Sequence, residues 1–306
     1  MIDITLLGCG GSMPTPDRYL SSTLISYRGR KILIDCGEGT QVSMKIVNSG
    51  FKSIDYICIT HIHGDHIIGL PGLLSTIGNS GREEPLTIIG PEGIKEAVDA
   101  FMVMVRDLPY ELRVIENPKE DIIVNNNYIC KDIIISTLEV DHSTPCIAYS
   151  FYIKRKAKFD LEKAISNNVP KELWNKLQNG RDIRVEDTLY TKDMVMGQPR
   201  KGLKVSLVTD TRPNKAIEQF VKNSDLLICE GMYGDNSDID RAIKNKHMVF
   251  SESANIAKNS QSEMLLLTHY SPILKDPSIY IENATNIFEN TILGTDRLNI
   301  NLVFKE

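Results

Sequence analysis

Three histidines and one aspartate lie within the six residues "HIHGDH", His61 to His66, of a chain that has only six histidines in 306 residues. Side chains of an extended segment alternate faces, so His61 and His63 point the same way and can bind one metal. Gly64 then lets the chain turn, which directs Asp65 and His66 toward a second metal. Imidazole and carboxylate ligands suit Zn²⁺, with Mn²⁺ or Fe²⁺ as alternative occupants. The spacing favours a metal site over histidines of an ordinary core or surface.

Three more metal-competent side chains end apolar runs: His142 after "STLEV", Asp210 after "VSLVT" and His269 after "MLLLT". Each alone is more often a turn residue or a helix cap, and Asp210 could cap a helix that starts near Pro213. Together they place five of the six histidines at strand ends, where ligands from different strands can converge. The sixth, His247, lies in a loop before a helical pattern.

The elements that must position these residues are mostly strands. Short β-branched runs ended by Gly, Pro, Asp or His predict strands within residues 2–10, 20–37, 53–61, 85–91, 132–142, 147–154, 204–211 and 225–233. Helical periodicity predicts helices within residues 93–105, 213–223, 250–260 and 277–290. Strands in succession, followed by strands alternating with helices, indicate sheets packed between helical layers.

Composition narrows the class of protein. A hydrophobic content of 42% with 25% charged residues is typical of globular domains. The N-terminus lacks a basic signal region, and no apolar run approaches the roughly 18 residues of a membrane span, so we expect a soluble cytoplasmic protein without a membrane partner. The six cysteines form no C-x-x-C pair, which favours reduced, buried thiols over disulfides or a thiolate zinc site.

One segment, residues 153–201, differs in charge from the rest. It has twelve lysines and arginines against seven acids, a net charge of +5, whereas the remainder of the chain carries −10. It also lacks strong strand runs and holds the only tryptophan, Trp174. We interpret it as an inserted arm, which is either a solvated flap or a docking site for nucleic acid.

These motifs resemble a known family. The order H-x-H-x-D-H, His, Asp, His is similar to the metallo-β-lactamase superfamily, and "THIHGDHIIGLPGLL" resembles ribonuclease Z, the tRNA 3′-processing endoribonuclease. The stretches "DCGEGTQ" at Asp35–Gln41, "TDTRP" around Asp210 and "CEGMY" around Glu230 agree. The resemblance implies an α/β fold, a four-layer αββα sandwich forming one domain over residues 1–306, with the basic insertion 153–201 as the tRNA-binding arm. It also implies precursor tRNA as partner and a homodimer.

The resemblance further implies the roles of the site residues. His61, His63 and His142 would hold one Zn²⁺, Asp65, His66 and His269 a second, and Asp210 would bridge the two. A hydroxide between the metals would attack the phosphodiester at the 3′ trailer and leave a 3′-hydroxyl on the tRNA. Asp65 would orient that hydroxide. His247, held by Glu230, would protonate the leaving oxygen.

Two stretches depart from the family pattern, and two other functions stay open. The arm reads "NNVPKELWNKL" where the family has a Gly-Pro-rich stretch, and the loop "PTPDRYLSS" at Pro14–Ser22 lacks a lysine that many members have. On the same scaffold, the chain could hydrolyse a small phosphodiester, an arylsulfate or a lactone. It could also be a metal-dependent RNA-binding module without catalysis.

Overall fold

A computed structural model describes residues 1–105, 107–124 and 132–305 of the chain. Within these residues the chain forms two compact units. The larger unit consists of residues 1–153 and 203–305, and the smaller unit of residues 154–202. The smaller unit starts and ends within one residue of the predicted insertion.

The first sheet of the larger unit has seven strands among the described residues, in the order β16-β1-β2-β3-β4-β5-β6. Strands β3 to β6 run parallel to one another, whereas β16, β1, β2 and β3 are joined by antiparallel pairs. The bounds are β1 Ile2–Gly8, β2 Ser22–Tyr27, β3 Arg30–Ile34, β4 Ile54–Cys58, β5 Leu86–Gly90, β6 Leu112–Glu116 and β16 Leu298–Leu302.

The second sheet of the larger unit also has seven strands in the described part of the chain, in the order β15-β14-β13-β12-β9-β8-β7. Strands β12 to β15 are parallel, and β7, β8 and β9 are antiparallel. The bounds are β7 Ile122–Val124, β8 Ile133–Val140, β9 Cys146–Arg155, β12 Arg200–Val208, β13 Leu226–Glu230, β14 Leu265–Thr268 and β15 Thr291–Leu293.

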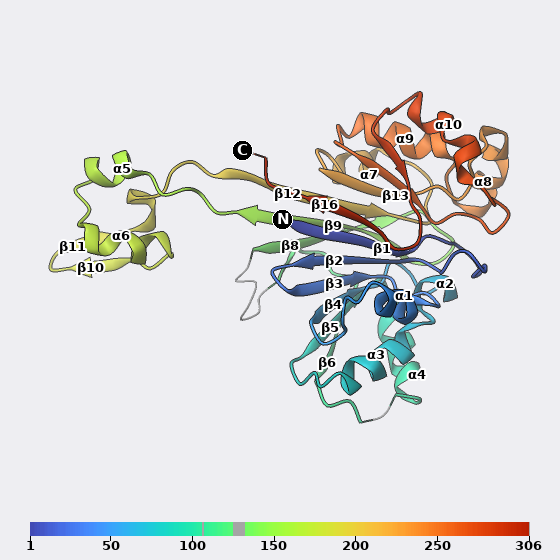
Figure 1. The fold of residues 1–306 in the computed structure, drawn as a ribbon, viewed down its shortest axis with the longest axis horizontal. Helices are drawn as coiled ribbons and strands as arrows, with labels where there is room; N and C mark the ends of the chain where they lie inside the picture. The colour runs from blue at the N-terminus through green and yellow to red at the C-terminus, as the bar shows by residue number, and fades with distance from the viewer. Residues whose placement is uncertain (106, 125–131, 306) are drawn as a thin grey trace. The chain divides into compact units, whose positions relative to one another are not determined.

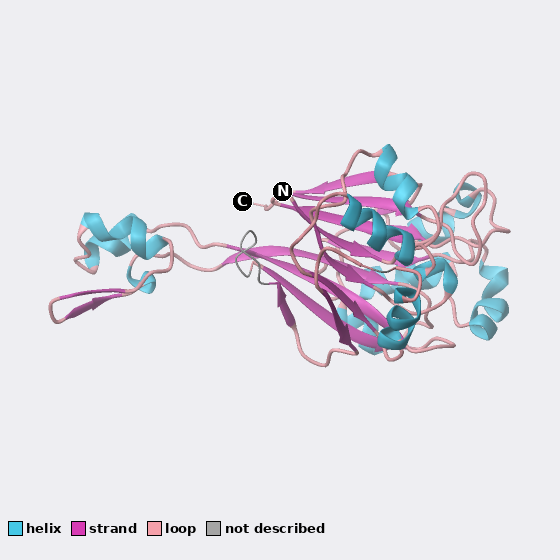
Figure 2. Ribbon diagram, turned by 90° about the horizontal axis from the view of Figure 1, so that it is seen from below, coloured by secondary structure: helices cyan, strands magenta, loops and turns pink. Residues whose placement is uncertain are grey.

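Helices cover the outer faces of the two sheets (Figures 1 and 2). Beside the first sheet lie α1 Thr40–Ile46, α2 Gly64–Ile67, α3 Leu70–Asn79 and α4 Ile94–Met102; beside the second lie α7 Lys215–Phe220, α8 Ile239–Asn245, α9 Phe250–Asn259 and α10 Glu282–Thr285. Period-two burial explains the layers. Ile4 and Leu6 of β1 join the core shared with the second sheet, while Leu7 packs in the core beneath α1, α3 and α4. The predicted four-layer αββα sandwich is confirmed.

Two helix predictions need correction. The expected helix within residues 277–290 is only the 3₁₀ turn Pro277–Tyr280 followed by the four-residue α10. Helix α3 is absent from the predicted helices, and its sequence "LPGLLSTIGN" contains one proline and two glycines. Pro71 lies in the first turn, where its missing N–H costs nothing, and a Cβ on Gly72 would lie 2.5 Å from the side chain of Gln41.

The smaller unit has its own apolar core. Helices α5 Leu161–Ser166 and α6 Lys171–Gln178 pack with the hairpin β10 Ile183–Val185 and β11 Thr188–Tyr190. Val169, Leu173 and Leu177 are buried there, and Trp174 packs beside them and donates its indole N–H to the carbonyl of Val169. The charged side chains of the smaller unit therefore lie on the surface of a folded unit.

Two further expectations concern cysteines and membranes. Cys9, Cys36, Cys58, Cys146 and Cys229 are free and buried, as expected, whereas Cys130 lies outside the described residues. Among the described helices none has the length and apolar character needed to cross a bilayer.

Candidate metal centre

The candidate ligands lie just beyond the ends of strands from both sheets. His61 and His63 follow β4 of the first sheet, and Asp65 and His66 lie in α2. In the second sheet His142 follows β8, Asp210 follows β12 and His269 follows β14. Asp210 (φ 48°) and His269 (φ 59°) have the left-handed backbone that is rare outside glycine. All seven therefore approach one edge of the sandwich.

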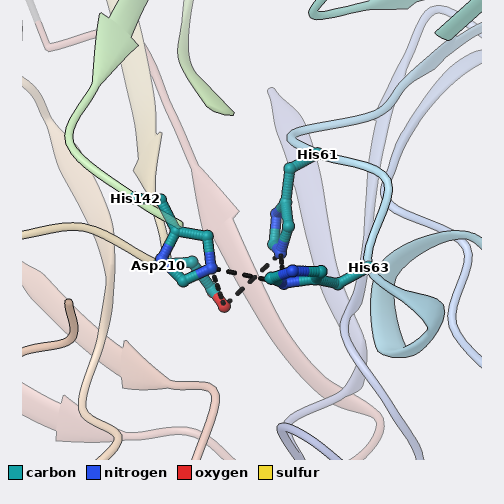
Figure 3. A group of neighbouring side chains, drawn as sticks. All are labelled: His61, His63, His142 and Asp210. Carbon is teal, nitrogen blue, oxygen red and sulfur yellow. Dashed lines mark hydrogen bonds and ion pairs between the residues drawn. The ribbon is translucent and has the colours of Figure 1, made fainter. Parts of the chain in front are cut away.

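The first group contains His61, His63, His142 and Asp210, whose side chains point toward one another (Figure 3). Nδ1 of His63 lies 3.0 Å from Nε2 of His61 and 3.3 Å from Nε2 of His142. Oδ2 of Asp210 lies 3.6 Å and 3.8 Å from the same two Nε2 atoms. Four ligand atoms thus face a common centre.

The second group contains Asp65, His66 and His269. The Nε2 atoms of His66 and His269 lie 3.0 Å apart, and Oδ2 of Asp65 is 3.5 Å and 3.4 Å from them. Oδ1 of Asp210 lies 3.5 Å and 3.2 Å from those same nitrogens. One oxygen of Asp210 therefore faces each group.

The spacing of these atoms fits a metal. A tetrahedral ion with bonds of about 2.0–2.2 Å holds its ligand atoms about 3.3–3.6 Å apart. The nine distances given above scatter around that value, from 3.0 to 3.8 Å, and all ligand atoms of a group lie within 4.8 Å of one another. The imidazoles of His61, His66, His142 and His269 are buried, whereas that of His63 is not. Burial, followed by nearby His66, lowers the pKa of His61 well below its usual value, which favours the neutral form that binds metals.

The electrostatics of Asp210 depend on its histidine neighbours. Its side chain is almost fully buried, and burial alone would raise its pKa. The imidazoles of His269, His66 and His61 outweigh burial and hold the pKa of Asp210 well below its usual range. Asp210 is not the helix cap that its position also allowed, because Asn214 accepts the N–H of Ile217 and caps α7.

Asp35, which the sequence argument left without a role, orients His66. Its Oδ2 lies 2.7 Å from Nδ1 of His66, so it accepts that N–H and leaves Nε2 for a metal. Oδ1 of Asp35 accepts the backbone N–H of Thr60 at 2.7 Å. In the sequence, Asp35 is only a single aspartate after the apolar run "KILI", and nothing in that pattern indicates His66 as its partner.

His247 and Glu230 form a separate pair beside the ligands. Nδ1 of His247 lies 3.0 Å from Oε2 of the buried Glu230, which also accepts the backbone N–H groups of Thr211 and Met248. Burial acts to lower the pKa of His247, but the Glu230 carboxylate outweighs it and raises that pKa to about 9. With Nδ1 engaged, Nε2 is the nitrogen left for a substrate.

A third possible ligand group, Asp210, His247 and His269, competes with this interpretation. Nδ1 of His247 is 4.0 Å from Oδ2 of Asp210 but only 3.0 Å from Glu230. The nitrogen of His247 on the Asp210 side is thus the one that Glu230 engages, and the raised pKa of His247 favours its protonated form, which does not bind a metal, so we assign His247 to the Glu230 pair.

A cavity of 390 Å³ opens onto both groups. Its lining includes Asp65, His142, Asp210 and His247, together with residues 244–246 at the end of α8. The loop also supports the ligands, because the carbonyl of Lys246 lies 3.3 Å from Nδ1 of His142. Four of the candidate ligands, His63, Asp65, His142 and Asp210, therefore line one cleft together with His247.

The contact of Asp35 with His66 generates a prediction. Asp35→Asn keeps the shape but weakens the acceptor that fixes His66, so metal affinity should fall about 10- to 100-fold. Competition with a chromogenic chelator measures this directly. The matched control is Asp17→Asn, an exposed aspartate; equal affinities for the two variants would contradict the role of Asp35.

Comparison with known proteins places the chain. It is 60% identical to Ribonuclease Z of Clostridium beijerinckii and 58% identical to Ribonuclease Z of Clostridioides difficile, each over the full length of both chains. A family model described as Anti-Pycsar protein Apyc1 matches residues 2–102.

Solved structures agree in fold. Human tRNase Z, short form, has a TM-score of 0.69 at 23% identity, and the metallo-β-lactamase fold protein YhfI of Bacillus subtilis has 0.68 at 18%. Each comparison covers 98% of both chains. The solved structures show the fold, whereas the identity to full-length relatives establishes the family. The chain belongs to the ribonuclease Z family of metal-dependent endoribonucleases.

Proposed function

We propose that this protein is a zinc-dependent endoribonuclease that removes the 3′ trailer of precursor tRNA. The observation that carries the proposal is the arrangement of two ligand groups that share Asp210 beside the His247–Glu230 pair. Relatives named Ribonuclease Z support the substrate class. We assign His61, His63 and His142 to one Zn²⁺, Asp65, His66 and His269 to the other, and Asp210 to both.

The residues divide the chemistry. Two such metals supply a nucleophile from water at neutral pH and neutralise charge on the phosphoryl oxygens. Asp65, whose Oδ2 accepts the backbone N–H of Ser12 at 2.6 Å, is held where it can orient the attacking water and accept its proton. Hydrolysis breaks the bond between phosphorus and the 3′ oxygen of the upstream ribose. His247 donates a proton from Nε2 to that oxygen, which leaves a 3′-hydroxyl on the tRNA.

We propose that the smaller unit docks the tRNA. Lys171, Lys176, Arg181 and Arg184 are exposed on it, and a cavity of 540 Å³ in the same unit is lined by Arg155, Lys156, Lys163 and Lys192, with Asp193 as the one acid among its lining residues. Folded RNA presents mainly phosphates and shape to a protein, so lysines and arginines are the expected contacts.

We also propose a cytoplasmic homodimer. The five described cysteines are buried thiols, which suits a reducing compartment. Val42 and Ile46 of α1 and Ile68 after α2 are 49%, 59% and 52% exposed, an apolar face that a second copy would cover. Sedimentation equilibrium that gives one chain per particle would reject the dimer.

A small phosphodiester is the second candidate substrate. The match to the Apyc1 model covers residues 61–66 but none of the residues from His142 onward. It therefore does not distinguish precursor tRNA from a small phosphodiester as the substrate.

The substrate assignment is tested with a 3′-extended tRNA. The purified protein should release the trailer and leave a 3′-hydroxyl, and a chelator should stop the reaction until zinc is added back. Mapping both product ends measures this. Hydrolysis of a small aryl phosphodiester without cleavage of the tRNA would favour the small-substrate alternative.

A second experiment separates proton donation from metal binding. His247→Ala should keep its metal content but cleave precursor tRNA about 10²- to 10⁴-fold more slowly, the usual contribution of a general acid. An aryl phosphodiester should suffer less, because its leaving group needs little protonation. Equal losses on both substrates, or loss of metal, would contradict the assignment.

The docking role is tested by removing only charged surface side chains. The buried Val169, Leu173 and Leu177 stay in place, so the smaller unit should remain folded. Replacing Lys171, Lys176, Arg181 and Arg184 by alanine should weaken precursor-tRNA binding and flatten its dependence on salt. If all four side chains contact phosphates, the slope of log affinity against log salt concentration should become less steep by about 3.

The matched control for this experiment replaces four exposed lysines of the larger unit, Lys45, Lys95, Lys222 and Lys258. Docking by the smaller unit is supported if its quadruple variant loses more tRNA affinity and more salt dependence than the control variant. If both variants change the salt slope by the same amount, the docking role is wrong.

A further inference from the structure

We propose that a second pocket, beside the metal cleft across α8, binds the nucleotide immediately upstream of the scissile phosphate. This pocket, called here the α8 pocket, has a volume of 270 Å³, and its lining includes Tyr233, Arg241, Ile273, Lys275, Ile279 and Tyr280. The proposal rests on the proposed function, since it assumes RNA as the substrate and His247 as the proton donor.

The α8 pocket adjoins the side of the cleft where the leaving oxygen must lie. The ring of Tyr233 is 6.4 Å from the ring of His247, centroid to centroid. Asn245, which lines the metal cleft, donates a hydrogen bond of 2.9 Å to the hydroxyl of Tyr233. Ser271, also in the pocket lining, follows the candidate ligand His269 by two residues. The hydrogen bond from Asn245 to Tyr233 therefore connects the lining of the metal cleft with the lining of the α8 pocket.

Chemistry decides which nucleotide this is. The oxygen that His247 protonates is the 3′ oxygen of the upstream ribose, so that ribose must lie against His247. The base attached to it then extends to the neighbouring side of His247. Because Tyr233 stands there, the upstream base, rather than the first base of the trailer, is the one that reaches the α8 pocket.

The lining offers apolar and aromatic surface for a base. Ile273 and Ile279 are 68% and 70% exposed, although large apolar side chains usually avoid water. Aromatic rings bind unstacked bases with little sequence preference, and the two isoleucines add apolar surface beside Tyr280. The guanidinium of Arg241 lies 5.2 Å from the centre of the Tyr233 ring, and neither Arg241 nor Lys275 makes an ion pair with the described residues.

The shape of the pocket is fixed by the local backbone. A Cβ on Gly234 would lie 2.7 Å from the ring of Tyr280, so glycine is what lets that ring form a wall. The carboxylates of Asp235 and Asp276 accept the backbone N–H groups of Ser237 and Ser278 and are already engaged. The pocket thus has apolar and aromatic walls, two cations, Arg241 and Lys275, and three carboxylates, Asp235, Asp238 and Asp276.

The test is a double-mutant cycle between protein and RNA. On a precursor tRNA with a normal upstream nucleotide, Ile273→Ala with Ile279→Ala should lower kcat/KM about 10-fold, because the base loses apolar contact with two side chains. On the same RNA with an abasic site at that position, the double variant and the wild type should react alike. An abasic site one nucleotide into the trailer should leave the difference between the two proteins intact.

Ile243→Ala supplies the matched control, because Ile243 is a 54% exposed isoleucine of α8 that is absent from the pocket lining. It should change none of the rates. Hydrolysis of a small aryl phosphodiester should be unchanged in every variant, which shows that the metal cleft is intact.

The proposal fails if the pocket variant loses the same factor on normal and abasic RNA, or loses nothing on either. A wild-type protein that does not cleave precursor tRNA at all would instead overturn the proposed function, so the two failures are distinguishable.

Discussion

The site depends on one buried carboxylate, Asp210, whose two oxygens face two groups of candidate metal ligands. A buried carboxylate is costly unless positive charge or hydrogen-bond donors surround it, and five imidazoles lie within 4.0 Å of this one. Its left-handed backbone costs on the order of 1–3 kcal/mol more. Metals between the carboxylate and the imidazoles of His61, His66, His142 and His269 would offset both costs.

The sandwich provides this arrangement because strands of both sheets end at the same edge. Ile4 and Leu6 of the first sheet pack against side chains of the second sheet, which sets the distance between the sheets. The same packing therefore sets the distance between the loop after β4 and the loop after β12. Parts of the site are also mutually tied, since Asp35 holds His66 and the Lys246 carbonyl holds His142. Displacing one loop would thus disturb ligands and proton donor together.

The sequence predicted best what is local. The "HIHGDH" spacing is a short-range pattern, and strand ends were visible as apolar runs, so all seven candidate ligands could be named. The His247–Glu230 pair followed only from the family resemblance, because residues 17 apart in sequence met through tertiary packing. Asp35 was missed for the same reason: it lies 31 residues from His66. Helix α3 was missed because packing, not propensity, decides a helix with two interior glycines.

The central claim is that Asp210 joins two metal sites, and the most direct measurement is the zinc content per chain after saturation and removal of free metal. The account predicts two ions for the wild type, one for His142→Ala and for His269→Ala, and fewer than one for Asp210→Ala. A wild-type protein with a single ion, or an Asp210→Ala variant that retains two, would contradict it.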